Sequence, residues 1–267
     1  MDSKVVVALG VGLGLSLFFY RRKHTQSPRS KNDGIVWLIG AGPGDVDLLT
    51  VKGMNLVRQA DVIVADELVD RSISDLAPAG CKFIEMGKRG GKADSVPQED
   101  INTVLVAECK KGHRVARLKG GDPLVFGRVW PEIEALNAAG CQYDVIPGVT
   151  SALSAPAAVG IPITHKELSR HFVVVSCHKP DELDFADLSK IDTIVILMGT
   201  RTLPIITSRL QEAGLTPSLP VAIIQWAGRP EQRVFVGTLD TIVKQTQGET
   251  LSPAIVVIGK VAALAKV

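Results

Sequence analysis

The amino-acid sequence predicts an α/β protein with two lobes, mostly parallel sheets and a cleft between the lobes. Short runs of β-branched residues alternate along the chain with longer segments of helical character. Most of the short runs are continuously apolar, which is typical of strands that are covered on both faces. A stretch rich in glycine and proline, residues 147–162, separates five such runs from five more, and this division indicates two lobes.

The expected elements follow one another in a regular order. The candidate strands of the first lobe are residues 35–39, 61–65, 82–85, 114–118 and 142–146, and those of the second are 172–177, 193–198, 221–225, 233–236 and 254–258. The helical segments are 48–59, 99–111, 131–139 and 203–213. Gly112, Gly140 and Gly214 stand just past three of these segments, where glycine commonly ends a helix.

An uncharged apolar segment, residues 5–20, lies near the start of the chain and is followed at once by Arg21, Arg22 and Lys23. Its length is close to the lower limit of about 17 residues for a membrane-spanning helix. Bulky residues at its end are unsuited to signal-peptide cleavage. We therefore expect a membrane anchor, with the basic cluster holding the remaining chain in the cytosol. The alternative is a soluble cytoplasmic or organellar protein with a buried hydrophobic leader.

These patterns predict three parts: an anchor with a polar linker at residues 1–33, a first α/β lobe at 34–147 and a second at 148–267. The composition, with 46% hydrophobic and 22% charged residues, is that of a packed globular protein. A net charge of +2 and only 4% aromatic residues argue against a nucleic-acid partner. The four cysteines lie 28 or more residues apart, without zinc-site spacing, so we expect reduced thiols and no metal.

A glycine-rich turn, GAGPGD at residues 40–45, follows the first candidate strand directly. Glycines at this place let the main chain approach a ligand closely. A dinucleotide fingerprint requires the third glycine one position later, and Pro43 interrupts the pattern. Because Asp66 lies at a suitable distance for a ribose-binding acid, NAD binding remains an alternative, as does a purely structural loop.

Charged residues follow the next two candidate strands. Asp66 stands in VADELV at residues 64–69, and Lys88 in MGKRGGK at 86–92. A carboxylate and an ammonium at neighbouring strand ends could serve as base and acid in one cleft. The alternative is a pair of solvated charges.

Two further glycine-rich turns follow candidate strands of the same lobe, in ARLKGGDPLVFGR at residues 116–128 and PGVTSA at 147–152. We name residues 40–45, 120–128 and 147–152 the glycine rim. Three such turns at strand ends predict an elongated polar ligand held largely by main-chain groups.

Together with GIPITH, ILMG and RPEQRVFVGTL, these motifs occur in the order typical of one family. From about Gly34 onward the chain resembles the tetrapyrrole methyltransferase superfamily, and within it the uroporphyrinogen III C-methyltransferases. The resemblance implies the tetrapyrrole methylase fold, a homodimer, and S-adenosylmethionine (AdoMet) bound at the base of the cleft. It also implies two methylations of uroporphyrinogen III, at C2 and C7, giving precorrin-2 for sirohaem or cobalamin.

The resemblance also implies roles for individual residues. Asp66 would accept a proton and Lys88 would donate one. The AdoMet site would be lined by Pro43, Gly120, Gly121, Asp122, Val125, Thr150, Ser151, Met198 and Ala227. Because the substrate carries eight carboxylates, we expect a cationic rim formed by Lys88, Arg89, Lys92, Arg117, Lys119 and Arg128.

The sequence departs from the family pattern at a few positions. Val129, Trp130 and Pro131 replace two glycines and a glutamate after Arg128, and Ala65 replaces a tyrosine before the base. Residues 225–228 replace another family stretch. Three alternatives stay open: a methyltransferase for a later precorrin or for diphthine, an NAD(P)-binding oxidoreductase, and a ligand-binding protein without activity.

Overall fold

The computed structural model describes residues 34–87 and 96–266, which belong to one compact unit spanning Asn32–Val267. The predicted anchor and linker, and the predicted site residues Lys88, Arg89 and Lys92, lie outside the described residues. Within the described ranges, no helix combines the length and apolar character needed to cross a membrane.

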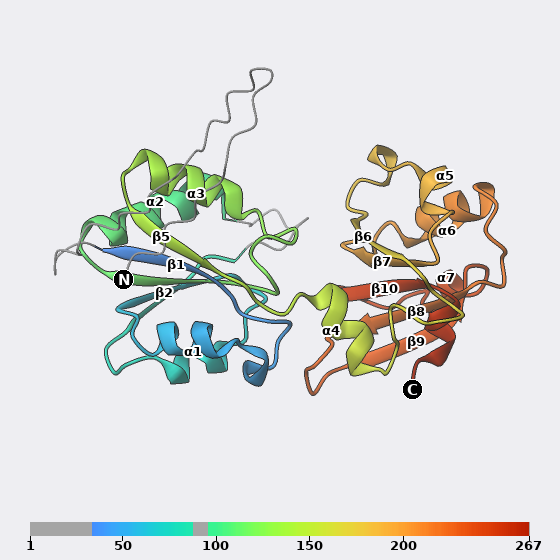
Figure 1. Ribbon diagram of the computed structural model, residues 1–267, viewed down its shortest axis with the longest axis horizontal. Helices are drawn as coiled ribbons and strands as arrows, with labels where there is room; N and C mark the ends of the chain where they lie inside the picture. Colours follow the sequence, from blue (N-terminus) through green and yellow to red (C-terminus); the bar gives the residue numbers. More distant parts are fainter. Residues whose placement is uncertain (1–33, 88–95, 267) are drawn as a thin grey trace, which may run out of the picture. The chain divides into compact units, whose positions relative to one another are not determined.

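The first sheet is entirely parallel and has the strand order β3-β2-β4-β1-β5 (Figure 1). Its strands are β1 (Ile35–Gly40), β2 (Val62–Ala65), β3 (Lys82–Glu85), β4 (Arg114–Lys119) and β5 (Gln142–Ile146). In the register, Ile35 of β1 lies opposite both Arg114 and Gln142, so these three strands begin at one edge. Their carboxyl ends, and the glycine rim that follows them, therefore share the opposite edge.

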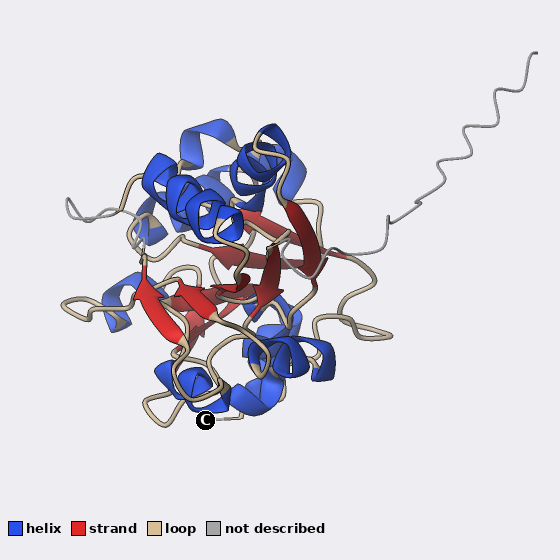
Figure 2. Ribbon diagram, turned by 90° about the vertical axis from the view of Figure 1, so that its left-hand side faces the viewer, coloured by secondary structure: helices blue, strands red, loops and turns tan. Residues whose placement is uncertain are grey.

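Helices cover both faces of this sheet. The helices are α1 (Val51–Val57), α2 (Gln98–Lys110) and α3 (Val129–Ala138), with a 3-10 segment, η2 (Arg71–Leu76). α2 and α3 lie over one face, and α1 lies over the other (Figure 1). Figure 2, turned by 90°, shows helices on both sides of the strands. The central strands, such as β1 and β2, are therefore buried on both faces. This burial accounts for their continuous apolar runs in the sequence.

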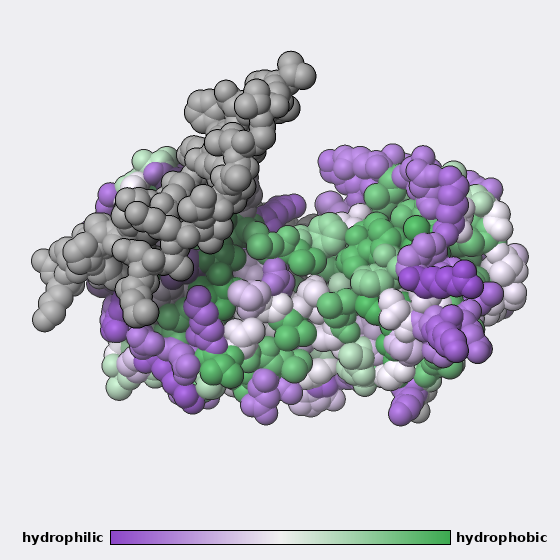
Figure 3. Space-filling view, in the orientation of Figure 1, coloured by the Kyte–Doolittle hydropathy of each residue, from purple (hydrophilic) through white to green (hydrophobic). Residues whose placement is uncertain are grey.

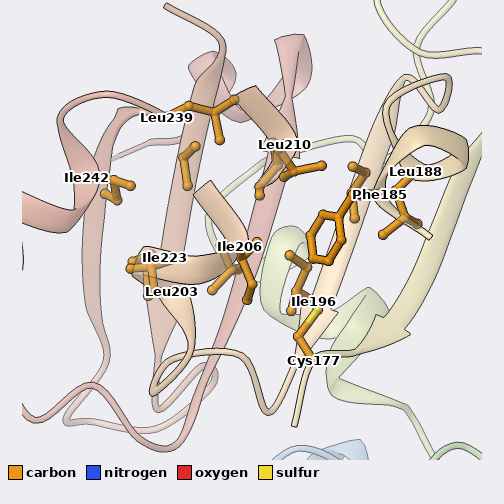
Figure 4. Close-up of a cluster of buried hydrophobic side chains, with 14 of the residues drawn as sticks. Cys177, Phe185, Leu188, Ile196, Leu203, Ile206, Leu210, Ile223, Leu239 and Ile242 are labelled. Atoms are coloured by element: carbon orange, nitrogen blue, oxygen red, sulfur yellow. The ribbon is translucent and has the colours of Figure 1, made fainter. Parts of the chain in front are cut away.

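The second sheet has the order β6-β7-β10-β8-β9 and is mixed. Its strands are β6 (Phe172–Ser176), β7 (Thr193–Leu197), β8 (Pro220–Gln225), β9 (Arg233–Thr238) and β10 (Ala254–Gly259). The associated helices are α4 (Ser151–Ala158), α5 (Phe185–Leu188), α6 (Leu203–Glu212) and α7 (Ile242–Gln245), with η4 at Lys260–Leu264. Phe185, Leu210 and Ile242 pack with buried residues of the sheet on one face (Figure 4), and α4 with η4 covers the other.

All ten candidate strands are present at the expected positions, and the expected α/β class is confirmed. Five of the eight strand pairings among the described residues are parallel, and the three antiparallel ones all lie in the second sheet. The loop from β8 to β9 is one reason, because residues 226–232 are too few for a parallel crossover. The sheets divide where the two lobes were expected to meet, and the boundary between separate domains stays a prediction.

The cysteines are free thiols, of which Cys109, Cys141 and Cys177 are buried. Burial raises the pKa of the Cys177 thiol to about 11, so this group packs as a small apolar side chain (Figure 4). Within the residues that the structure covers, no three histidine, cysteine or acidic side chains gather as metal ligands would.

Candidate active site

The three segments of the glycine rim meet at the carboxyl edge of the first sheet. Gly42 and Gly121 exchange two main-chain hydrogen bonds, of 3.2 and 2.8 Å between N and O. A Cβ atom added to Gly40 would lie 2.5 Å from the Cα atom of Gly148. At Gly40 and Gly148 no larger residue fits without moving main-chain atoms, so the close approach of the three segments explains these two glycines. Gly42 and Gly121 have φ angles of 75° and 70°, in the left-handed region that favours glycine.

Asp122 and Thr150 hold the rim together from within. One carboxylate oxygen of Asp122 accepts a hydrogen bond from the Gly148 amide at 3.0 Å, and the other accepts from the Leu124 amide at 2.8 Å. The Thr150 hydroxyl oxygen accepts from the Ala152 amide at 3.3 Å and so caps α4. The bond from Gly148 joins the turn after β4 to the turn after β5, and the other two are local to one turn each.

Four non-glycine residues of the described chain have positive φ angles: Phe126 (53°), Arg128 (51°), Met198 (57°) and Trp226 (50°). Each follows the carboxyl end of a strand, namely β4 for the first two, β7 for Met198 and β8 for Trp226. This backbone conformation is unfavourable for side chains other than glycine and is concentrated at functional sites. Two of the four residues, Met198 and Trp226, lie in loops of the second sheet. These loops hold Met198 and Ala227, two of the expected AdoMet contacts.

Most of the residues expected to hold AdoMet are accessible. Gly121 is buried, whereas the other members of the set are half-buried or exposed: Pro43, Gly120, Asp122, Val125, Thr150, Ser151, Met198 and Ala227. A Cβ atom on Gly121 would come within 3.6 Å of the Thr150 Cα and 3.7 Å of the Ser151 amide nitrogen, so these residues are neighbours. Six of the nine are glycine, proline, alanine, serine or threonine, so main-chain groups and short side chains predominate. Figure 3 shows the same side of the molecule as Figure 1, with hydrophobic and hydrophilic residues mixed along its middle.

Asp66, the expected proton acceptor, follows β2 directly and is part of a cluster of four charged side chains. Arg117 pairs with Asp66, and the Lys119 ammonium lies 3.9 Å from the second Asp66 carboxylate oxygen. Glu132 of α3 accepts hydrogen bonds on one oxygen from Lys119 at 2.7 Å and from Arg117 at 3.2 and 3.1 Å. Only Asp66 in this cluster keeps substantial exposure, at 26% of its side chain.

The surroundings of Lys119 and Arg117 shift the pKa values of these two side chains in opposite directions. Burial lowers the pKa of the Lys119 ammonium, and the nearby charge of Arg117 lowers it further. Burial also opposes the charge of Arg117, but the carboxylates of Asp66 and Glu132 outweigh it and raise the pKa of the guanidinium. The cluster therefore keeps a charged arginine against the carboxylate of Asp66.

The positions of Arg117 and Lys119 differ from the expected cationic rim. Their side chains are only 1% and 3% exposed, and both are paired with carboxylates of the chain. We therefore revise their role: these contacts suit them to hold Asp66 rather than to receive substrate carboxylates at the surface. Arg128 is exposed at the start of α3, as a rim residue should be.

Glu132 is absent from the residues singled out in the sequence. A signal was present, because Arg117 and Lys119 alternate at the end of a strand whose other residues after Arg114 are apolar, and so point to one face. Two cations inside a covered sheet require an acidic partner. The sequence does not indicate which of the acidic residues in the following helices supplies it.

The departures from the family pattern fit the start of α3. Val129 is buried in the core, Pro131 occupies the first turn, where proline is tolerated, and exposed Trp130 donates to a carboxylate oxygen of Glu134 at 2.9 Å. Ala65, in place of tyrosine, is buried at the end of β2. Val129 and Pro131 are therefore compatible with the start of this helix.

Two surface concavities lie away from the rim. One, of about 430 Å³, is lined by residues at the amino ends of strands, including Lys82 and Arg114. The other, of about 380 Å³, is lined by Thr164, His165, Lys166, Ser169 and Arg170. The cleft between lobes stays a prediction.

Comparison with known proteins gives a consistent result. The family model of the tetrapyrrole (corrin/porphyrin) methylases matches residues 36–243. A uroporphyrinogen-III C-methyltransferase of Synechococcus elongatus is 47% identical over 87% of this chain and 96% of its own length. One of Priestia megaterium is 43% identical over 85% of this chain and 98% of its own.

Solved structures agree in fold. The uroporphyrin-III C-methyl transferase of Thermus thermophilus, complexed with S-adenyl homocysteine, has a TM-score of 0.74 and 34% identity. The match covers 86% of this chain and all of that one. The chain therefore belongs to the tetrapyrrole (corrin/porphyrin) methylase family and, within it, to the uroporphyrinogen-III C-methyltransferases.

Proposed function

We propose that this chain transfers two methyl groups from AdoMet to uroporphyrinogen III, at C2 and then C7, giving precorrin-2 for sirohaem or cobalamin. The match to the Synechococcus relative over nearly the full length of both chains carries the proposal. The structural relative complexed with S-adenyl homocysteine, the demethylated form of AdoMet, supports the choice of methyl donor. No metal takes part in the proposed reaction.

AdoMet supplies the methyl group and leaves as S-adenosylhomocysteine. The glycine rim, with Met198 and Ala227 from the second sheet, would hold it through main-chain groups. Support comes from the two hydrogen bonds between Gly42 and Gly121 and from the Asp122 bridge to Gly148, which connect the segments of the glycine rim to one another. Rigid alignment is the main contribution to a displacement at a methyl group.

Asp66 is the proposed base, removing a proton as conjugation shifts in the methylated macrocycle. Arg117 holds the carboxylate from the protein side, while the exposed part of the side chain stays available to substrate. Lys88, the proposed acid, lies outside the described residues. Lys88, Arg89, Lys92 and Arg128 remain the proposed cations for the substrate carboxylates.

We also propose a homodimer, attached to a membrane through residues 5–20 with the folded part facing the cytosol. The apolar segment and the basic residues after it support attachment. Fractionation of cells that express the full chain, compared with a chain lacking residues 5–20, tests attachment. Recovery of both forms in the soluble fraction would instead support a soluble cytoplasmic or organellar protein. Analytical ultracentrifugation in detergent tests the dimer.

Turnover of the full-length chain tests the function. The protein, AdoMet and anaerobically generated uroporphyrinogen III are mixed, and S-adenosylhomocysteine and the absorbance of oxidised precorrin-2 are followed. We expect two equivalents of S-adenosylhomocysteine per macrocycle. AdoMet binding without transfer would contradict the substrate and point to a later precorrin or diphthine. Thermal stabilisation by NAD(P) instead of AdoMet would indicate an oxidoreductase.

Asp66→Asn tests the base, with Asp61→Asn as its matched control. The two aspartates flank β2, and each pairs with an arginine of β4. We expect Asp66→Asn to lower kcat by about 10²- to 10⁴-fold, the usual contribution of a positioned base. Asp61→Asn should leave kcat unchanged. Equal activity of the two variants would remove Asp66 from the mechanism.

A further inference from the structure

Arg229 reaches from the second sheet to the segment that begins with Asp66. It lies in the loop 226–232 between β8 and β9. Its Nη2 donates a hydrogen bond to the carbonyl oxygen of Leu68 at 2.7 Å, and its Nη1 lies 3.7 Å from a carboxylate oxygen of Asp70. The amide of Val69 in turn donates to the carbonyl oxygen of Asp66 at 3.1 Å, so Leu68 lies inside a tight turn that starts at Asp66.

The same side chain lies against the first turn of the glycine rim. A Cβ atom added to Gly44 would lie 2.6 Å from the Nε and 2.9 Å from the Cγ of Arg229. Gly44 directly follows Pro43, a proposed AdoMet contact. The stem of Arg229 therefore packs on the main chain beside the proposed donor site.

Arg229 is also held within its own loop. Its guanidinium carbon lies 5.1 Å from the centre of the Trp226 ring, and its amide donates to the Trp226 carbonyl oxygen at 3.0 Å. The Gly228 amide donates to the side-chain oxygen of Gln232 at 3.0 Å and closes the loop. Ala227, another proposed AdoMet contact, lies between Trp226 and Gly228.

Burial leaves one donor atom of the Arg229 side chain without a partner among the described residues. The side chain is 18% exposed, and its Nε is buried without a hydrogen-bond partner among the described residues. An unpaired buried donor is unfavourable, and such sites in folded proteins call for an explanation. Contact with three segments that each carry a proposed reacting or donor-binding residue supplies one.

We propose that Arg229 is a positioning residue that fixes the segments of Pro43, Asp66 and Ala227 relative to one another. This inference rests on the proposed function. Arg229 acts through the carbonyl of Leu68 and the main chain of Gly44. In this way the methyl donor and the base are both positioned at the same macrocycle. A small shift of atoms at any of these contacts would misalign the donor and the base. The rate of methyl transfer is sensitive to such misalignment.

The test compares Arg229→Ala and Arg229→Lys with Arg233→Ala in the full-length chain. Arg233 is a matched control, since it also has a ring contact, 4.9 Å to Phe235, and an ion pair, 2.9 Å to Glu249. Both of these contacts remain on the side of the second sheet. Kinetics with AdoMet and uroporphyrinogen III, calorimetry with S-adenosylhomocysteine, and the melting temperature are measured for each variant.

We expect Arg229→Ala to lower kcat by about 10- to 100-fold and to weaken S-adenosylhomocysteine binding several-fold. Arg233→Ala should change neither quantity. Arg229→Lys should recover part of kcat, because it keeps the charge near Asp70 without the fork that reaches Leu68. The melting temperatures of Arg229→Ala and Arg233→Ala should be similar.

Wild-type kcat and S-adenosylhomocysteine affinity in Arg229→Ala would overturn the proposal. So would equal losses of kcat in Arg229→Ala and Arg233→Ala that follow equal losses of melting temperature, because the arginine would then serve stability alone. If the wild-type chain methylates no uroporphyrinogen III, the proposed function fails by itself. The S-adenosylhomocysteine affinities of the two alanine variants then still decide whether Arg229 shapes the donor site.

A double substitution tests the contact with Gly44. Gly44→Ala should weaken S-adenosylhomocysteine binding in the wild-type chain, through its φ of 155° and the approach to Arg229. The additional loss should be smaller in Arg229→Ala, where the new methyl group meets no arginine stem. Equal losses in both backgrounds would remove Gly44 from the proposed contact.

Discussion

The two ends of β2 carry the same chemistry in opposite surroundings. Asp61 precedes the strand and pairs with Arg114, and Asp66 follows it and pairs with Arg117. Beside each pair, a buried glutamate of a covering helix accepts hydrogen bonds from several basic side chains. It is Glu108 of α2 at the amino end and Glu132 of α3 at the carboxyl end.

The difference lies in the cations. Lys82 and Lys111, which pair with Glu108, have side chains 58% exposed, whereas Arg117 and Lys119 are buried with Glu132. Exposed cations keep most of their hydration and are screened by salt. Buried cations lose their hydration, and only well-placed carboxylates compensate for the loss. The amino end thus contributes modest stability, while the carboxyl end holds Asp66 in one arrangement beside the glycine rim.

Among changes at the two ends of β2, removal of the Glu132 charge should lower the free energy of unfolding most. Glu132→Gln leaves Arg117 and Lys119 buried with Asp66 as their remaining charged partner among the described residues. Because breaking a buried ion pair is strongly destabilising, the free energy of unfolding should fall by about 3 kcal/mol. Urea unfolding followed by circular dichroism measures the change.

Glu134→Gln is the control for this prediction. Glu134 lies in the same helix, and its carboxylate accepts from the exposed Trp130 ring. A glutamine can accept the same bond, so the midpoint of unfolding should stay close to that of the wild type. A Glu132→Gln protein as stable as Glu134→Gln would show that the buried cluster does not depend on this charge.

Neutralisation of Glu108 should have a smaller effect that depends on pH. Burial raises the pKa of Glu108, but hydrogen bonds from Lys111, His113 and Lys82 outweigh it and lower the pKa to about 2. At neutral pH we expect Glu108→Gln to cost about 1 kcal/mol, because its exposed partners are screened by solvent.

The sign of the pH dependence follows from the lowered pKa. The folded value of about 2 lies below the ordinary value of 4.5, so the stabilisation by Glu108 is complete above pH 4.5. It is lost as the pH falls from there toward 2. Urea midpoints of the wild type and Glu108→Gln should therefore converge across that window, and a constant difference would contradict the assignment.

The Asp61–Arg114 pair should show the smallest effect. Arg114 lowers the pKa of Asp61 through side-chain hydrogen bonds, chiefly at 2.7 and 3.0 Å, but both partners are partly exposed. Asp61→Asn should cost about 0.2–1 kcal/mol, and the cost should shrink in 1 M salt. A loss as large as that of Glu132→Gln would erase the distinction between the two ends of β2.

The sequence was sufficient to locate the strands and the glycine-rich turns that follow them. Continuous apolar runs located most of the strands, because strands covered on both faces must be apolar throughout. The rim glycines were expected to let main chain approach a ligand, and this stays a prediction. The structure adds that the main chains of Gly40, Gly121 and Gly148 lie close to one another. The direction of β8 to β10 was not readable in the same way, because an antiparallel strand buried on both faces has the same apolar pattern as a parallel one.

The charged residues required the tertiary structure. The sequence by itself determined the fold class, the family and the accessible candidates Asp66 and Arg128, because local patterns and motif order carry that information. Only the tertiary structure decided that Arg117 and Lys119 are buried, that Glu132 is their partner and that Arg229 contacts Leu68. Arg229 and Leu68 are 161 residues apart. Such partners are chosen by the packing of helices on sheets, because the energy of a charge depends on its burial and neighbours and not on its position along the chain.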